Sequence, residues 1–368
     1  MAMTGGTVGK SYLIKELVEK LYLNQRVVCI NTFNELININ YIYTVIQSPF
    51  IKNLINTSKN STNDNISIGI INNFLIPLPS INVQNKIINK LQSIYPIIFN
   101  YNLKYTLLEN LNISYKEELK KSILQYAIQG KLIKQNINDE SAEVLINKIL
   151  DEKRELIKTK QIKKENLSVI YKDDTDNQFY EKFDDGRIVN ITDEIPFDIP
   201  NNWRWARMKN ICLINPKNSL DDNLETSFIP MSLIDAGYSN SHTYEIKKWK
   251  EIKSGFTNFK ENDIGLAKIT PCFQNRKSTI FSNLKNGFGA GTTELYILRP
   301  INDLIYTKFI FWLIKSPYFI DNGVKTYSGT AGQQRINKDF IPNFLVPIPN
   351  YKTQVCIINK IENIFNLI

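Results

Sequence analysis

The longest regular pattern in the chain is a series of apolar residues spaced alternately four and three positions apart. It runs through Ile87, Leu91, Ile94, Ile98, Tyr101, Tyr105 and Leu108, shifts by one residue, and continues through Leu111, Tyr115, Leu119 and Ile123. This spacing marks the apolar face of a coiled-coil-type helix, and the shift is a stutter. The pattern predicts a helix that binds a partner helix through Tyr101, Tyr105, Leu108, Leu111, Tyr115, Leu119 and Ile123. The alternative is a helix buried on its own domain.

Local signals predict where the helices end. Pro96 interrupts the pattern and predicts a short first helix and a longer second one. Gly130 is placed to end the long helix, because a helix commonly closes on a glycine with positive φ. A further helix is predicted from about Ser141 to Lys160, with the charged residues 152–155 on its polar face.

Two segments of the chain repeat one pattern. Residues 72–91 and 342–361 share ten identities at a constant offset of 270, and Ser48-Pro-Phe50 corresponds to Ser316-Pro-Tyr318. Further upstream, residues 26–30 correspond to residues 294–298. Such an ordered series indicates two copies of one module, at a period too long for a solenoid.

The two copies differ in extent. Copy one begins at Ala2-Met-Thr4, which resembles the interior run Ala267-Lys-Ile-Thr270, so we expect it to lack its N-terminal half. Copy two is expected to stop before its long helix. The predicted fold class is α+β, with duplicated mixed α/β modules separated by a long coiled-coil-type helix. The predicted divisions are a truncated first module (1–92), a spacer helix and follow-on helix (93–165), an acidic linker (166–198), a complete second module (199–350) and the start of a second spacer helix (351–368).

Charge is distributed unevenly. The chain carries +9, from 45 Lys+Arg against 36 Asp+Glu. Residues 171–198 hold nine acids and three bases, a net of −6, which leaves +15 for the remainder. The acidic stretch is polar and aperiodic, as expected of a connector. A basic remainder favours nucleic acid over a membrane surface as partner, the alternative being an ordinary solvated surface.

Candidate catalytic groups are few. His242 is the single histidine, in a polar stretch that predicts a surface turn, and the four cysteines have no metal-type spacing. No catalytic residue, metal site or cofactor is predicted. With no apolar run of about 18 residues and no signal-peptide pattern, we expect a cytoplasmic protein.

Three motifs resemble enzyme signatures but depart from them. Residues 4–11 resemble a P-loop, although Thr4 stands in place of its first glycine. Residues 287–291 resemble a dinucleotide loop, yet they precede a strand-like run instead of a helix. Asp235 with Glu251 and Lys253 loosely matches a nuclease set. A solvated turn is the favoured interpretation of that last group.

Several runs carry a family resemblance in a characteristic order. They are Ile199-Pro-Asn-Asn-Trp-Arg-Trp205, Phe228-Ile-Pro-Met-Ser232, Gly329-Thr-Ala-Gly-Gln-Gln-Arg-Ile336, the duplicated Phe-Leu-(Ile/Val)-Pro-(Leu/Ile)-Pro ending, and Lys121-Ser-Ile-Leu-Gln-Tyr-Ala-Ile-Gln-Gly-Lys131. The chain resembles the specificity (S) subunits of type I restriction–modification enzymes over essentially its whole length.

The resemblance implies two target-recognition domains, joined by antiparallel spacer helices and each reading half of a split DNA target. It implies a non-catalytic subunit that directs methyltransferase (M) and restriction (R) subunits. The alternative is a stand-alone nuclease or methyltransferase with degenerate motifs. If the second spacer helix stops at Ile368, the long helix is expected to self-associate or to depend on M subunits.

Base reading needs hydrogen-bonding side chains backed by cations that contact phosphate. The predicted DNA contacts in copy two, which holds 19 Lys+Arg against 12 Asp+Glu over residues 199–350, are Lys217, Asn218, Lys268, Gln274, Asn275, Arg276, Lys277, Tyr327, Ser328, Thr330, Gln333, Gln334 and Arg335. In copy one we expect only phosphate contacts, from Lys10 and Lys59. Polar hairpin turns are the alternative interpretation of these loops.

Overall fold

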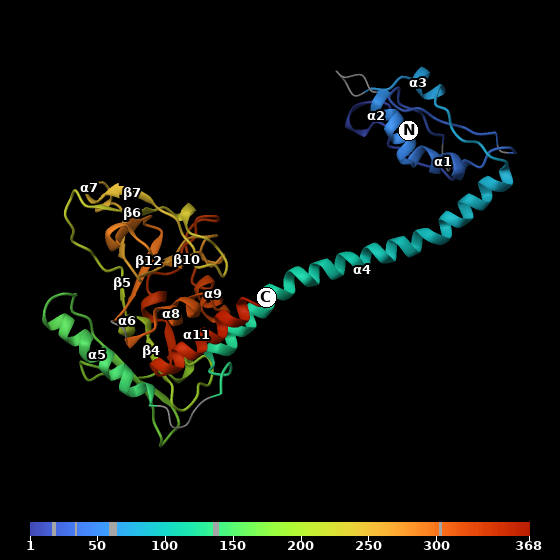
Figure 1. Ribbon diagram of the computed structural model, residues 1–368. Coiled ribbons are helices and arrows are strands. Elements are labelled where there is room, and N and C mark those ends of the chain that lie inside the picture. Colours follow the sequence, from blue (N-terminus) through green and yellow to red (C-terminus); the bar gives the residue numbers. More distant parts are fainter. Residues whose placement is uncertain (17–19, 34, 59–64, 135–139, 302–303) are drawn as a thin grey trace. The chain divides into compact units, whose positions relative to one another are not determined.

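The computed structural model describes residues 1–368 except 17–19, 34, 59–64, 135–139 and 302–303. The chain divides into two compact units, Met1–Asn112 and Ile113–Ile368, called unit 1 and unit 2 below. Figure 1 shows the elements of each. Helices and sheets occur together with one long helix, which confirms the predicted α+β fold class.

Unit 1 is mainly helical. Its elements are a 3-10 turn at Gly5–Thr7, α1 (Ile39–Gln47), α2 (Pro49–Ser58), α3 (Ile68–Asn72) and the first part of α4 (Ile81–Ile128). The Asn38 side chain caps α1 by accepting from the backbone N–H of Asn40 and Tyr41. The core consists of small clusters, one around Ile42 and Ile88 and another around Ile51 and Ile55.

The long helix α4 is continuous, so the predicted division at Pro96 is wrong. A proline removes one backbone hydrogen bond, but α4 is exposed on both sides of Pro96. Water can hydrate the released carbonyl there, so the helix accommodates the proline. The predicted end at Gly130 is confirmed, since its φ is +70° and Lys131 N donates to Tyr126 O at 2.9 Å. A Cβ at Gly130 would also lie 2.5 Å from Pro200.

The strands of the described part of the chain all lie in unit 2. Its elements after α4 are α5 (Ala142–Lys158), β1 (Ser168–Lys172), β2 (Phe179–Phe183), β3 (Ile188–Asn190), β4 (Arg204–Arg207), α6 (Met208–Ile211), β5 (Cys212–Ile214), β6 (Glu225–Ile229), β7 (Glu245–Lys248), α7 (Trp249–Ile252), β8 (Thr257–Lys260), β9 (Ile264–Ala267), β10 (Ser278–Ile280), β11 (Phe288–Gly291), β12 (Leu295–Pro300), α8 (Thr307–Ile314), α9 (Pro317–Val324), α10 (Phe340–Asn343), β13 (Leu345–Ile348) and α11 (Tyr351–Phe365). The follow-on helix predicted near residues 141–160 is α5. Its Lys153, expected on the polar face, is instead buried and paired with Glu165 at 2.8 Å.

Two four-stranded sheets form the centre of unit 2. One has the order β10-β9-β12-β5 and is antiparallel, and the other has the order β7-β6-β11-β8, in which β6 and β11 are parallel. The Phe259 and Phe281 rings stack at 3.7 Å in the cluster they share with Leu295 and Ile297. The glycines of residues 287–291 have a packing role, because a Cβ at Gly289 would lie 2.5 Å from Ser227 O.

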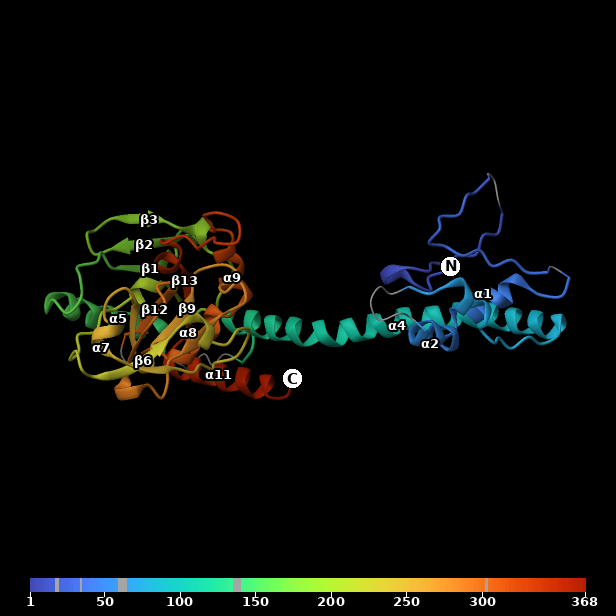
Figure 2. The ribbon, with the colours of Figure 1, turned by 90° about the horizontal axis from the view of Figure 1, so that it is seen from above.

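Residues 166–198 are not the aperiodic connector that their composition predicted. They form the antiparallel sheet β1-β2-β3, which Figure 2 shows as a layer of its own at one margin of unit 2, beside β13. Ile170 and Ile191 are buried there against Trp205 and Leu345. Net charge therefore misidentified the segment, because its apolar residues pack against one another and against Trp205 and Leu345 of other strands.

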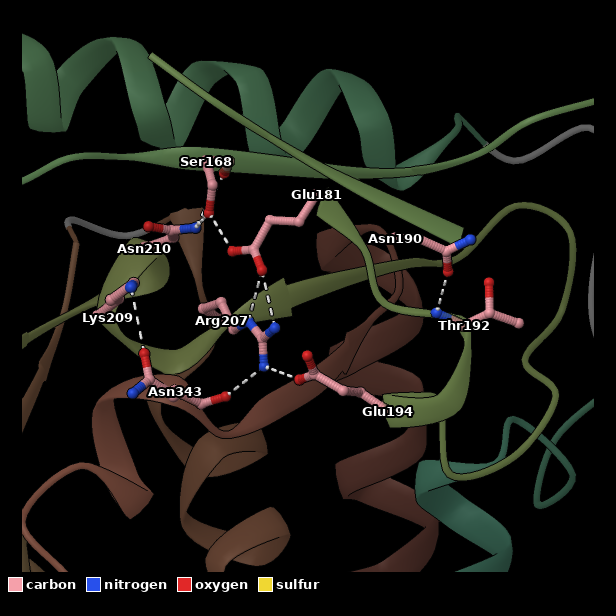
Figure 3. Close-up of polar contacts among 9 residues, drawn as sticks. All are labelled: Ser168, Glu181, Asn190, Thr192, Glu194, Arg207, Lys209, Asn210 and Asn343. Atoms are coloured by element: carbon pink, nitrogen blue, oxygen red, sulfur yellow. Dashed lines mark hydrogen bonds and ion pairs between the residues drawn. The ribbon is translucent and has the colours of Figure 1, made fainter. Parts of the chain in front are cut away.

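A buried ion pair ties this small sheet to β4 (Figure 3). The Arg207 guanidinium donates to Glu181 at 2.7 Å and to the Asn343 carbonyl oxygen at 2.8 Å, and it pairs with Glu194 at 2.8 Å. Burial acts to raise the pKa of Glu181, but hydrogen bonds from Arg207 and Ser168 prevail and lower it. Two of the acidic residues in this segment, Glu181 and Glu194, thus hold the small sheet against β4 through Arg207.

The sequence repeat is also a repeat of hydrogen bonds. Buried Gln84 accepts from Asn38 N at 2.9 Å and donates to Pro79 O at 2.8 Å. Its counterpart Gln354 accepts from Tyr306 N at 2.9 Å and donates to Pro349 O at 3.0 Å. The duplicated glutamine therefore joins the start of α1 to the start of α4 in unit 1, and the start of α8 to the start of α11 in unit 2.

The β register repeats as well. Ala2 pairs with Val27 in unit 1, as Ala267 pairs with Leu295 in unit 2. One residue further on, Met3 O accepts from Ile66 N at 2.9 Å, and Lys268 O accepts from Ile336 N at 3.0 Å. These matched bonds confirm that the two units share one module.

Candidate nucleic-acid interface

In unit 2 the predicted contact loops meet on one surface, which we call the loop platform. It consists of the β9–β10 turn (268–277), the segment 327–336 after α9, and the turn at Glu294 before β12. Lys268 N donates to Glu294 O at 2.9 Å, and Ile336 N donates to Lys268 O at 3.0 Å. Because these bonds join all three segments, the backbone of the platform is held in one arrangement.

The segment 327–336 folds back on itself. Ser328 and Arg335 exchange backbone hydrogen bonds of 3.0 and 2.9 Å. Gly329 and Gly332, with φ of 111° and 82°, make the turn between them in a region that strains other residues. Gln334 O accepts from Thr270 N at 2.9 Å, which fastens the turn to the neighbouring segment.

Arg335 is engaged by the protein itself. Its Nε and one terminal nitrogen donate to Glu294 at 2.9 and 2.7 Å, and the other terminal nitrogen donates to Gln333 O at 3.2 Å. The Arg335 hydrogen bonds lower the pKa of Glu294. In this state Arg335 braces the platform, and it would have to leave Glu294 to read a guanine. The sequence prediction missed Glu294, because its counterpart in copy one is Arg26.

The side chains that the platform presents to solvent are mostly neutral and polar. Gln274, Asn275, Thr330 and Gln333 are exposed, as is Ser328. Gln334 is half-buried, and the Lys268 ammonium lies 5.5 Å from the centroid of the Tyr296 ring. Amides that can pair with adenine, beside a cation that can contact phosphate, form a chemically suitable surface for DNA.

Three other predicted contacts are turned into the protein. Arg276, with φ of 57°, donates to Lys315 O at 3.0 Å and lies over the Tyr238 ring. Lys277 donates to Met231 O at 2.7 Å. The Tyr327 ring packs edge-on against Phe273. These residues shape the 268–277 turn, and none of them faces outward as expected.

A buried lysine, absent from the sequence prediction, anchors that turn. Lys315 lies at the junction of α8 and α9, is 0% exposed, and donates to Arg276 O at 2.9 Å and Gly237 O at 2.7 Å. Burial lowers the pKa of Lys315 to about 7, and the Arg276 charge acts in the same direction. A neutral amine still has two N–H groups, enough for both carbonyls.

The same junction in unit 1 uses a glutamine. Gln47 precedes Ser48-Pro49 as Lys315 precedes Ser316-Pro317, and it donates to Ser11 Oγ at 2.7 Å and to Ser11 O at 3.4 Å. Counting from Ala2 and Ala267, Ser11 is the counterpart of Arg276. Both units therefore tie this turn to the same helix junction. The aligned Ser-Pro pairs locate the junction in the sequence, but its contacts to the turn depend on the tertiary structure.

Lys217 and Asn218 do not belong to the platform. Asn218 donates to Phe259 O at 2.9 Å and accepts from Arg299 at 3.2 Å. Lys217 lines a cleft of about 1150 Å³ with residues 260–263 and 299–301. Those residues stand at the start of β9 and the end of β12, whereas the platform lies at the opposite strand ends.

In unit 1, Lys10 is exposed on the turn of residues 4–11, and Lys59 lies outside the described residues. The P-loop-like run forms only the 3-10 turn Gly5–Thr7. In the described residues the next helix is α1, which begins at Ile39. The turn therefore lacks the helix N-terminus with which a P-loop holds phosphate.

The predicted partner-binding face of α4 is exposed over most of its length. Tyr101, Tyr105, Leu108, Leu111 and Tyr115 are 50–65% exposed. Leu119 is half-buried, and Ile123, at 7%, packs in the core of unit 2. Ile123 is thus a core residue of its own domain and is unavailable to a partner helix.

The enzyme-like groups do not assemble into a site. Lys253 pairs with Asp222 at 2.7 Å, and Asp235 accepts from Ser239. His242, expected in a surface turn, is half-buried and accepts from Ser282 N at 3.1 Å, and burial lowers its pKa. Within the described ranges, no group of three or more His, Cys, Asp and Glu residues could hold a metal ion. Nor is any described helix long and apolar enough to cross a membrane.

Sequence similarity relates the chain to one family of known proteins. Residues 1–110 match the family model of the type I restriction modification DNA specificity domain. Over 253 residues the chain is 41% identical to the type I restriction enzyme EcoAI specificity subunit of Escherichia coli. The chain is related to the specificity subunits of type I restriction enzymes. The EcoEI specificity subunit of the same organism is 39% identical over 253 residues.

The relationship covers part of these specificity subunits. Each alignment includes 68% of this chain, which spans about 40% of the EcoAI and 39% of the EcoEI subunit. Among solved structures, the HsdS subunit from Thermoanaerobacter tengcongensis aligns with 91% of this chain. The alignment covers 64% of the HsdS chain, at 15% sequence identity and a TM-score of 0.40.

Proposed function

We propose that the chain is a non-catalytic DNA-recognition subunit of a type I restriction–modification complex, and that the loop platform of unit 2 contacts the bases. The observation that carries this proposal is the platform itself, which gathers exposed amides and a lysine on hydrogen-bonded turns in a chain related to specificity subunits. We assign specific contacts to Gln274, Asn275, Gln333 and Gln334 and phosphate contacts to Lys268. Unit 1 would add phosphate contacts from Lys10.

Apart from the linker assigned to residues 166–198, the divisions predicted from the sequence are part of this proposal, with residues 199–350 as the reading module. Selecting bound duplexes from a random DNA pool tests it directly. We expect enrichment of a short defined sequence, retained when residues 1–92 are deleted and lost when Gln274 and Gln333 are both replaced by alanine. Equal enrichment of all sequences by the intact chain would contradict the assignment.

The alternative is a stand-alone nuclease or methyltransferase. Incubating the pure chain with DNA and either Mg²⁺ or S-adenosylmethionine separates the two functions. We expect intact, unmethylated DNA in both reactions, because the described residues hold no assembled set of catalytic groups. Cleavage or methyl transfer without partner subunits would reject the non-catalytic role.

We further propose that M subunits bind along the exposed face of α4, and that the chain, acting in the cytoplasm with M and R subunits, self-associates through this face without them. The supporting observation is the exposed apolar series from Tyr101 to Tyr115, because soluble proteins rarely leave such a stripe uncovered. Light scattering at tens of micromolar should show a dimer that Tyr105→Glu with Leu108→Glu converts to monomer. A monodisperse wild-type monomer would reject self-association.

A further inference from the structure

The 268–277 turn of the loop platform is bonded to a second loop around Gly237. Gly237 N donates to Asn275 O at 2.8 Å, and the buried Lys315 donates to the carbonyl oxygens of Gly237 and Arg276. Arg276 Nε donates in return to Lys315 O at 3.0 Å. Because these bonds form a closed set, the position of the Gly237 loop determines the position of the turn's backbone.

The residue after Gly237 joins this set to the long helix. The Arg276 guanidinium lies 5.1 Å from the centroid of the Tyr238 ring, and the Lys120 ammonium, from α4, lies 5.6 Å from the same centroid. A cation within about 6 Å of an aromatic centroid is attracted by the negative face of the ring. One side chain is therefore in attractive contact with both the platform turn and α4.

Rings from two further helices hold this contact in place. The Phe365 ring of α11 lies edge-on to Tyr238 at 5.6 Å, and its centroid is also 5.6 Å from the Lys120 ammonium. Trp312 of α8 packs edge-on against Phe365 at 5.0 Å. Lys120 is half-buried as a result, so its ammonium is attracted to the rings with less competition from water than a surface lysine has.

The ring of Tyr238, and not its hydroxyl, makes the useful contacts. The hydroxyl oxygen is buried and has no hydrogen-bond partner among the described residues. Burial raises the pKa of Tyr238 to about 12, so the side chain is neutral at physiological pH. A buried hydroxyl without a partner costs stability. Phenylalanine should therefore replace Tyr238 without loss, whereas an aliphatic side chain should not.

We propose that Tyr238 is a positioning residue that couples α4 to the platform turn, so that a change at Lys120 alters how Gln274 and Asn275 are presented to DNA. This inference rests on the proposed function of unit 2 as the DNA reader. Lys120 lies five residues after Tyr115, the last exposed residue of the face to which we assign M subunits. A partner carboxylate that pairs with Lys120 competes with the ring for its charge, and it thereby reaches the turn without touching DNA.

Hydrogen exchange on the full chain without DNA tests the coupling itself. Lys120→Gln should speed exchange of the Gly237 and Lys277 amides about 5-fold, because one cation–π contact contributes a factor of this size. Tyr238→Leu should speed them at least as much, and Tyr238→Phe should leave them unchanged. The matched control is Lys131→Gln, which removes the same charge just after α4, where the ammonium donates to Gln129 instead of facing a ring.

Amides of β12 should exchange at the wild-type rate in all four variants, which separates a loosened turn from an unfolded unit. Unchanged exchange at Gly237 and Lys277 in Lys120→Gln overturns the coupling. So does a Tyr238→Phe variant that behaves like Tyr238→Leu, since it assigns the effect to the hydroxyl.

Fluorescence anisotropy then tests the effect on recognition, with a duplex selected by the wild-type chain and a random duplex. Lys120→Gln and Tyr238→Leu should lower the ratio of the two affinities about 5-fold. Tyr238→Phe and Lys131→Gln should preserve the ratio. A loosened turn with an unchanged ratio overturns the positioning role. If the wild-type chain selects no sequence, the proposed function fails and the positioning role fails with it, while the exchange result still decides whether Tyr238 couples α4 to the turn.

Discussion

Units 1 and 2 share one sequence pattern, yet only part of it adopts the same structure. The helix pairs, the capping serines at residues 48 and 316 and the buried glutamines match bond for bond. The segment Phe-Leu-(Ile/Val)-Pro differs, because it is a buried strand in unit 2 and an exposed segment without strand structure in unit 1. Helix bonds close within a few residues, whereas a strand exists only beside a partner. The comparison therefore separates the self-sufficient half of the module from the half that needs a neighbour.

The largest expected effect comes from a contact that unit 2 has and the described part of unit 1 lacks. Glu181→Gln should destabilise unit 2 by about 3 kcal/mol, because it leaves the buried Arg207 charge underbalanced. The folded-state pKa of Glu181 is below its ordinary value of 4.5, so its contribution is present above pH 4.5 and lost as pH falls through the lowered pKa. Urea unfolding across pH 2–7 should show a smaller acid loss in the variant. An equal loss would reject the ion pair as its source.

The buried glutamines test whether the shared half is equally important in both units. Gln354→Leu should cost about 2–3 kcal/mol, because Tyr306 N and Pro349 O are left without their partner. Gln84→Leu removes the same two bonds from a smaller core, so we expect local opening of unit 1 and little change in unit 2. Hydrogen exchange of α1 and α8 amides reports on each unit separately. If Gln84→Leu slows or speeds the exchange of α8 amides, the two units are not independent.

Lys315, at the junction of α8 and α9, should make the stability of unit 2 depend on pH in a way that Gln47 cannot in unit 1. The folded-state pKa of Lys315 is about 7, below its ordinary value of 10.5, so folding releases a proton between these values. Stability of unit 2 should therefore rise with pH from 7 toward 10, at no more than about 1.4 kcal/mol per pH unit.

Lys315→Gln, which installs the side chain that unit 1 uses, should flatten this rise and keep the 268–277 turn protected from exchange. Lys315→Met should flatten the rise but expose the turn. If both variants protect the turn equally, the hydrogen bonds to Gly237 and Arg276 do not hold it.

The smallest effects are those on DNA binding by exposed cations. Arg335→Ala should weaken binding to a selected duplex about 10-fold more than binding to random duplex, if the guanidinium reads a base. Lys10→Ala should weaken both alike and reduce the salt slope by about 1. Fluorescence anisotropy at several salt concentrations measures both changes.

Glu294→Gln is the matched control for Arg335. This substitution weakens the ion pair with Arg335 but keeps the guanidinium. Specificity should therefore be preserved if Arg335 contacts a base. A loss equal to that of Arg335→Ala would show that Arg335 acts only by bracing the platform.

Part of the candidate site was predictable from sequence. The turns at Gly329 and Gly332 follow from glycine chemistry, and the placement of Gln274 and Gln333 on exposed loops follows from their polar neighbours. The inward orientation of Arg276 was not predictable, because it depends on Tyr238 and Lys315, which are distant in sequence. Lys217 was predicted as a DNA contact from the polar loop after Pro216, and the strand register places it at the other end of the sheet.

The sequence by itself determined what is local or repeated. It revealed the duplicated module at its offset of 270, the end of α4 at Gly130 and the start of α5 at Ser141, because caps and periodic faces depend on neighbours a few positions away. Only the tertiary structure decided that the acidic stretch is a sheet, that Ile123 is core and that Lys315 is buried. Each of these outcomes depends on packing against residues far apart in the chain, and the buried charges are tolerated because they are paired or hydrogen-bonded there.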